Sequence, residues 1–228
     1  MMTGIFLGID SILLHLLLFQ YLETRKKKYL LFISLSVGLA CICGEKGIAL
    51  CIASFISEMV VYLMTRIARI NSPIIRYWVS NRFLLISVFV FMVLVTVTIY
   101  NAISGSASYG KDVFGAYISN LYGTKRFSAM PFFSISIMHF IYLCVFIYIL
   151  IIRKQQKRDG IFVAFIMTAI LYIIAIGVGY IRIWASNNLM QNGEYMTGFG
   201  NYMLPVTILL YGLLLYLIVA QLGIKKKK

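Results

Sequence analysis

The chain has 228 residues, of which 61% are hydrophobic and only 12% are charged. An average soluble domain carries about 25% charged residues, so this composition excludes an ordinary soluble domain. The formal net charge is +14, but the positive charge lies in short segments between long apolar runs, which favours a membrane protein over a nucleic-acid-binding protein.

We interpret the apolar runs as seven transmembrane helices, since a span needs about 20 residues to cross the hydrocarbon layer. The predicted spans are residues 3–22, 29–43, 48–65, 83–100, 131–152, 161–180 and 203–224. No segment between them is long enough to act as a linker to a second domain. The sequence therefore predicts an all-α, polytopic seven-helix bundle that forms a single integral membrane domain over residues 1–228.

The basic residues indicate the direction of the chain. Sixteen of the 21 lysine and arginine residues fall in four clusters at every second gap between spans: Arg25 to Lys28; Arg66, Arg69, Arg76 and Arg82; Arg153, Lys154, Lys157 and Arg158; and Lys225 to Lys228. Short basic loops remain on the cytoplasmic side and meet anionic headgroups of the inner leaflet. We expect the N-terminus outside, the C-terminus in the cytoplasm, and a bacterial-type plasma (inner) membrane.

Two larger segments fall on the outer side in this topology. Residues 101–130 begin with a Gly- and Ser-rich stretch, and residues 113–127 are suited to a short helix on the membrane surface. Residues 184–202 are rich in Asn, Gly and aromatic side chains. If the protein binds an external ligand, we expect these loops to do so, although both are also suited to be plain solvated connections.

Ionisable residues inside spans are the candidate functional residues, because a charge in hydrocarbon costs about 2.5–3.5 kcal/mol on insertion scales. Asp10 and His15 lie in the first span, Glu58 near the middle of the third and His139 in the fifth. Ser11 and His15 share one helix face, whereas Asp10 and His15 do not. These side chains either form a proton or ligand path or hydrogen-bond neighbouring helices and aid assembly. We favour Asp10, Glu58 and His139 for a path.

Arg182 follows the glycine-containing outer end of the sixth span. Its side chain either captures an anionic ligand at the outer mouth or extends its charged end to the outer headgroups. Cys41, Cys43, Cys51 and Cys144 lack the spacing of a redox pair or a zinc site. We therefore expect no metal and no cofactor.

Enzyme motifs such as G-x-S-x-G, H-E-x-x-H and the P-loop are absent, so the sequence favours a non-enzymatic function. One arrangement is an exception. Cys51 opens the third span from outside, Asn101 ends the fourth and His139 lies in the fifth. This order resembles the exosortase and archaeosortase membrane transpeptidases over residues 48–145, and the resemblance implies catalytic roles for Cys51 and His139. Ser104 stands where that family has arginine.

The predicted topology also resembles the membrane half of peptide-pheromone sensor kinases. This resemblance implies a receptor or immunity protein that senses an external peptide or small ligand and acts through a partner. Our leading interpretation remains a small permease or a membrane subunit of a transport system, because deep ionisable residues occur without a catalytic signature. A partner membrane or cytoplasmic subunit would meet the basic inner loops, and any large cytoplasmic activity would belong to that partner.

Overall fold

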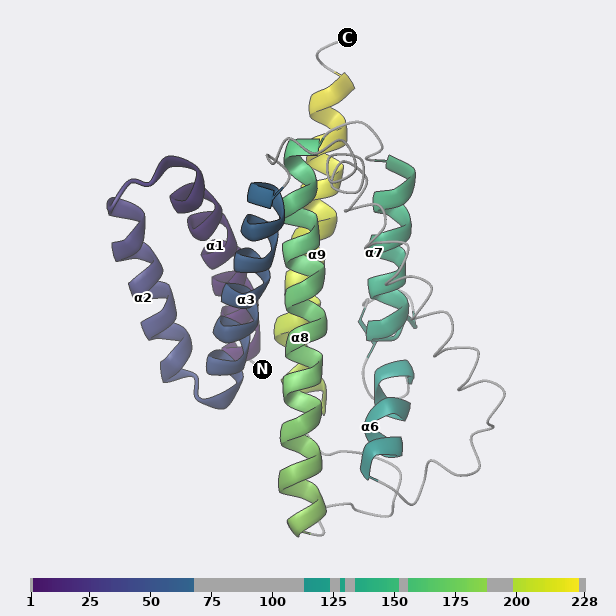
Figure 1. Cartoon of the computed structure of the whole chain (residues 1–228). Coiled ribbons are helices and arrows are strands. Elements are labelled where there is room, and N and C mark those ends of the chain that lie inside the picture. The colour runs from purple at the N-terminus through teal and green to yellow at the C-terminus, as the bar shows by residue number, and fades with distance from the viewer. Residues whose placement is uncertain are drawn as a thin grey trace.

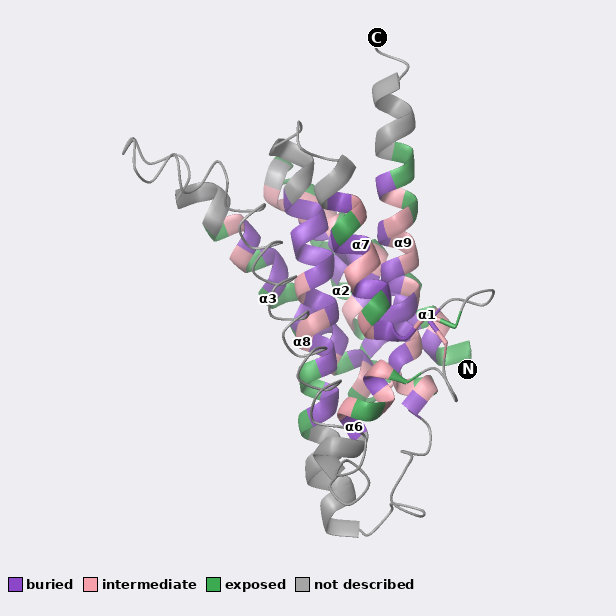
Figure 2. Cartoon of the chain, turned by 90° about the vertical axis from the view of Figure 1, so that its right-hand side faces the viewer, coloured by how far each residue is buried: buried purple, intermediate pink, exposed green. Residues whose placement is uncertain are grey.

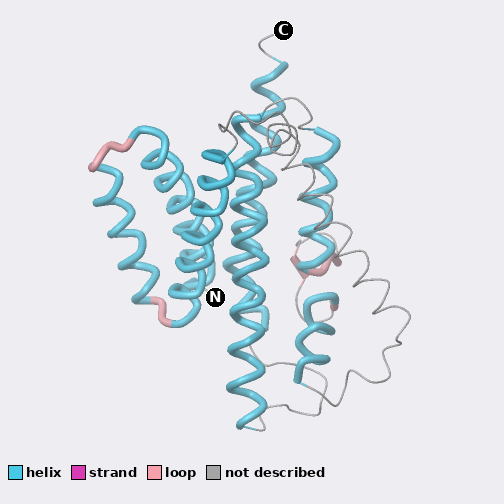
Figure 3. Tube along the Cα trace, viewed as in Figure 1, coloured by secondary structure: helices cyan, strands magenta, loops and turns pink. Residues whose placement is uncertain are grey.

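The computed structural model describes residues 2–67, 113–123, 128–129, 134–151, 156–187 and 199–225, and every regular element within them is an α-helix. The helices are α1 (Met2–Thr24), α2 (Lys28–Ile42), α3 (Glu45–Ile67), α6 (Val113–Tyr122), α7 (Ile137–Ile151), α8 (Gln156–Asn187) and α9 (Phe199–Lys225) (Figures 1 and 3). The predicted all-α fold is confirmed for this part of the chain.

The length and composition of the helices are consistent with an integral membrane protein. Among the described residues, α1, α3, α8 and α9 contain the four helical segments that are long and apolar enough to cross a membrane. Helices α2 and α7 are also apolar but shorter. The predicted fourth span, residues 83–100, lies outside the described residues.

Helices α1 to α3 form an up-down-up unit joined by two short turns (Figure 1). Arg25 and Gly44 reverse the chain in these turns with φ angles of 56° and 76°, in the left-handed region. Just after the second turn, Gly47 lies so close to α2 that a Cβ there would sit 1.8 Å from the Ala40 carbonyl oxygen. Glycine is therefore required at this contact.

Helix α9 packs against α1, and the two run in the same direction. Gly4 lies against Leu204, Gly8 against Ile208 and Ile12 against Gly212, so the partners are 200 residues apart in each pair. A constant difference in residue number between contacting partners is possible only if the two helices are parallel. Glycines at the contact allow the two backbones to approach closely, as in many membrane helix pairs.

Helix α8 lies at the centre of the described bundle, in contact with α3, α6 and α9. Buried residues run along it and along the facing side of α3 (Figure 2). The outer helix α2 instead exposes apolar side chains, among them Leu31 and Ile42, which are 64% and 83% exposed. An exterior of this kind suits lipid rather than water as the solvent.

Several helix ends differ from the predicted spans, among them those of α7 and α8. Helix α7 begins at Ile137 rather than near residue 131, because the Ser136 hydroxyl caps it by accepting the His139 N–H at 3.3 Å. Helix α8 continues to Asn187, beyond the predicted end at residue 180. Near the middle of α8, the Tyr117 hydroxyl of α6 donates to the Ile173 carbonyl at 2.6 Å, so α6 packs against α8.

Candidate functional site

Helix α1 carries three polar residues that are buried in the bundle. Asp10, Ser11 and His15 are 6%, 2% and 1% exposed, although they lie in a helix that is otherwise rich in Leu and Ile. Buried polar side chains need hydrogen-bond partners, and each of the three finds one on a neighbouring helix.

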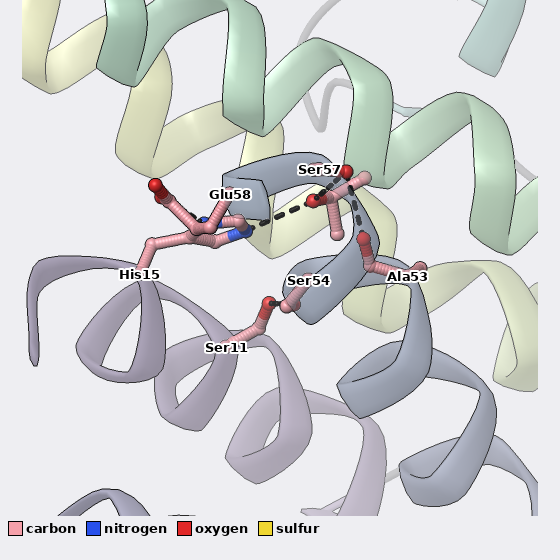
Figure 4. A network of polar contacts seen from close by, with 7 residues as sticks. Ser11, His15, Ala53, Ser54, Ser57 and Glu58 are labelled. Carbon is pink, nitrogen blue, oxygen red and sulfur yellow. Dashed lines mark hydrogen bonds and ion pairs between the residues drawn. The ribbon is translucent and has the colours of Figure 1, made fainter. Parts of the chain in front are cut away.

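Two of these contacts join α1 to α3. The hydroxyls of Ser11 and Ser54 are 3.3 Å apart, and His15 Nδ1 lies 2.8 Å from Glu58 Oε1 (Figure 4). Both pairs are separated by 43 residues, because α1 and α3 are parallel and each contributes positions i and i+4 to the interface. The side chains of His15 and Glu58 are 1% and 4% exposed, so this is a buried acid–base pair.

The other side of the His15 ring reaches α8. His15 Nε2 lies 3.0 Å from Thr168 Oγ1, and the ring stacks on Phe165 with centroids 4.8 Å apart. The Thr168 hydroxyl donates to Ser57 Oγ at 2.9 Å. Three helices thus hold one imidazole through both of its nitrogens and one face, so its orientation is fixed.

The chain of hydroxyls ends on the backbone. The Ser57 hydroxyl donates to the Ala53 carbonyl oxygen at 2.7 Å, one turn earlier in α3 (Figure 4). Ser57 and Thr168 are fully buried, so these hydrogen bonds are shielded from water. We call this set of contacts the His15–Glu58 network; its members are His15, Glu58, Thr168, Ser57 and the Ala53 carbonyl.

Chemically, the His15–Glu58 pair can bind or release a proton within a low-dielectric interior. A carboxylate and an imidazolium at hydrogen-bond distance neutralise each other, and the same is true of a carboxylic acid and a neutral imidazole. Either arrangement avoids the cost of an isolated buried charge. Among the described residues no group of three His, Cys, Asp or Glu side chains is arranged to hold a metal ion.

Asp10 takes part in a separate contact. Its Oδ1 accepts a hydrogen bond from the Ser36 hydroxyl at 2.8 Å, and both residues are buried between α1 and α2. None of the hydrogen bonds described at Asp10 joins it to the His15–Glu58 network.

His139 lies on α7 with a different set of neighbours. Its Nδ1 is 2.6 Å from Ser136 Oγ, and its ring meets Tyr122 and Tyr142 edge-on at 6.1 and 5.8 Å. The residue is exposed. Its described contacts include neither Glu58 nor Cys51, which is buried in α3.

Arg182 belongs to α8 by its backbone, while its side chain lies outside what the structure describes. Asn101 and Ser104 of the transpeptidase-like arrangement also lie outside the described residues.

Three members of the network were not among the residues predicted for the favoured path: His15, Ser57 and Thr168. A signal for His15 was present, because Ser11 and His15 repeat on α1 the four-residue spacing of Ser54 and Glu58 on α3. Two parallel helices with matched polar spacing are able to form both contacts at once. Nothing comparable marks Thr168, which is a lone hydroxyl in an apolar run.

No family model, curated protein or solved structure matches this chain.

Proposed function

We propose that this chain is a small permease, or the membrane subunit of a transport system, and that the His15–Glu58 pair exchanges protons during transport. The observation that supports this function is the 2.8 Å contact between His15 Nδ1 and Glu58 Oε1 inside a bundle of membrane helices. An intramembrane acid–base pair is costly to place, and in membrane proteins such pairs occur along ion and proton pathways.

The proposal includes seven spans, with the N-terminus outside and the C-terminus in the cytoplasm of a bacterial-type cell. The directions of the helices support it: α1, α3, α7 and α9 run one way and α2 and α8 the other (Figure 1). The exposed basic residues Arg25 to Lys28 at the turn between α1 and α2 would then meet anionic inner-leaflet headgroups or a partner subunit.

Proton flux into vesicles tests the function. The purified protein is reconstituted into phosphatidylethanolamine and phosphatidylglycerol vesicles that contain a pH-sensitive dye, and a pH gradient is imposed. We expect the parent to carry protons. In Glu58→Gln the rate of proton flux should fall at least tenfold, because an amide cannot take up the proton that Glu58 exchanges.

Glu45→Gln is the matched control, since it makes the same substitution at an exposed position in the first turn of the same helix. It should carry protons like the parent. A Glu58→Gln protein that folds and conducts at the parental rate would show that this carboxyl is not part of the path.

A further inference from the structure

The His15–Glu58 network has a definite order of donors, which starts at the backbone. The Ala53 carbonyl oxygen has no proton to give, so the Ser57 hydroxyl is the donor in their 2.7 Å contact. A hydroxyl carries only one proton, so Ser57 Oγ must accept in its 2.9 Å contact with Thr168.

The order of donors also fixes a proton on the imidazole. The Thr168 proton is directed at Ser57, so Thr168 Oγ1 has only lone pairs left for His15 Nε2 at 3.0 Å. Nε2 must therefore carry a proton and donate it. One proton remains for the 2.8 Å contact between His15 Nδ1 and Glu58 Oε1, and it is bonded to one of these two atoms.

We propose that Thr168 and Ser57 are positioning residues that fix His15 with a proton on Nε2, so that Nδ1 alone exchanges a proton with Glu58. This inference deepens the proposed function and rests on it for its role in transport. In the exchange an O–H bond of Glu58 breaks as the N–H bond at Nδ1 forms, and the pair stays neutral in sum.

The network also limits the route that a proton can take. The branch through Thr168 and Ser57 ends at a carbonyl oxygen, which cannot pass a proton on. This branch therefore orients the imidazole and does not conduct. Protons enter and leave the pair through the Glu58 carboxyl.

Nitrogen NMR of histidine tests this assignment directly, because the chain has only two histidines. In a His139→Gln background, the protein is labelled with ¹⁵N-histidine, reconstituted into lipid bilayers and measured at pH 7. We expect Nε2 of the parent to show the signal of a protonated nitrogen with a directly bonded hydrogen.

Three variants separate positioning from mere packing. Thr168→Val keeps the shape of the side chain but removes the hydroxyl, so Nε2 of His15 should no longer be held in the protonated form. Thr168→Ser keeps a hydroxyl at this position and should restore the parental signal. Ser57→Ala takes away the acceptor for the Thr168 proton, so Thr168 should then donate to Nε2 and shift the imidazole proton to Nδ1.

An unprotonated Nε2 in the parent overturns the proposal, and so does a Thr168→Val spectrum identical to that of the parent. The readout does not depend on transport. If the NMR results are as expected while Glu58→Gln conducts normally, the assignment of His15 stands and the proposed function fails. If Glu58→Gln abolishes flux while Nε2 is unprotonated, the proposed function stands and the positioning role fails.

Discussion

At the scale of single residues, His15 and Glu58 depend on each other inside the membrane. With one partner removed, the other is left buried without its counter-charge, which costs about 3–5 kcal/mol in buried pairs. A neutral hydrogen bond between membrane helices contributes only about 0.6–1.7 kcal/mol. Leaving one partner unpaired therefore costs more stability than the hydrogen bond itself contributes.

We predict that His15→Leu lowers the free energy of unfolding by about 3–5 kcal/mol and that adding Glu58→Leu restores most of it. The double variant leaves no unpaired ionisable group, and Thr168 keeps its hydrogen bond to Ser57. Thermal unfolding of the purified proteins in detergent measures the effect. A double variant as unstable as His15→Leu would contradict mutual dependence.

Gly47 is a second residue where one substitution is informative. Because a Cβ there would lie 1.8 Å from the Ala40 carbonyl oxygen, α2 and α3 must separate to admit any side chain. We predict that Gly47→Ala lowers the free energy of unfolding by at least the ~1–3 kcal/mol typical of overpacking. Thermal unfolding measures this change.

Gly38 is the matched control on α2, since a Cβ at this position meets nothing within 4 Å. Gly38→Ala should leave stability unchanged or raise it by about 0.5–1 kcal/mol, because alanine loses less backbone entropy on folding. Equal effects at the two glycines would argue against close contact between α2 and α3.

At the scale of helices, Gly8 and Gly212 of the α1–α9 interface differ in their tolerance for a side chain. A Cβ at Gly8 would lie 2.4 Å from Ile208 Cβ and 3.0 Å from the Pro205 carbonyl oxygen, atoms fixed by the backbone. A Cβ at Gly212 would lie 2.4 Å from Ile12 Cδ1, the flexible tip of a side chain. The first obstruction can be relieved only by moving a helix.

We therefore predict that Gly8→Ala lowers the unfolding temperature more than Gly212→Ala does. Ile12→Val removes the obstructing Cδ1 atom, so it should recover part of the loss in Gly212→Ala and none in Gly8→Ala. Thermal unfolding of the two single and two double variants provides the comparison. If Ile12→Val restores the unfolding temperature of both glycine variants equally, the described contacts do not determine the loss of stability.

At the scale of the whole molecule, the proposed topology places the α1–α2 turn in the cytoplasm and the α2–α3 turn outside. We predict that, with the four native cysteines replaced, an impermeant thiol reagent added to intact cells labels Glu45→Cys and not Lys27→Cys. Both positions are exposed, so access depends on the side of the membrane. The opposite labelling pattern would invert the proposed orientation.

The sequence was sufficient to predict helices, because apolar runs of about 20 residues are typical of membrane-spanning helices. It was not sufficient to predict which faces meet. Leu13 and Leu14 are neighbours in α1, yet they are 50% and 1% exposed. Lipid accepts the same side chains as a helix interface does, so apolar periodicity does not mark the buried side in a membrane protein.

The same limit explains the outcome at the site. Glu58 was identified as a candidate from its depth, and the structure places it in the network. His15 was left out of the favoured path, while Asp10 and His139 were included and contact other partners. Which ionisable residues meet depends on which helices touch, and Thr168 joins the network from 153 residues away.

The parallel contact of α1 with α9 also sets an order for assembly during synthesis. The residues that cover Gly4 and Gly8 are made 200 positions later, which is about 10–40 s at ordinary rates of translation. For that interval α1 has α2 and α3 as neighbours, and His15 already has Glu58 within reach. The acid–base pair can thus form early, before Thr168 is synthesised to orient the ring, and α9 is the last of the described helices to join.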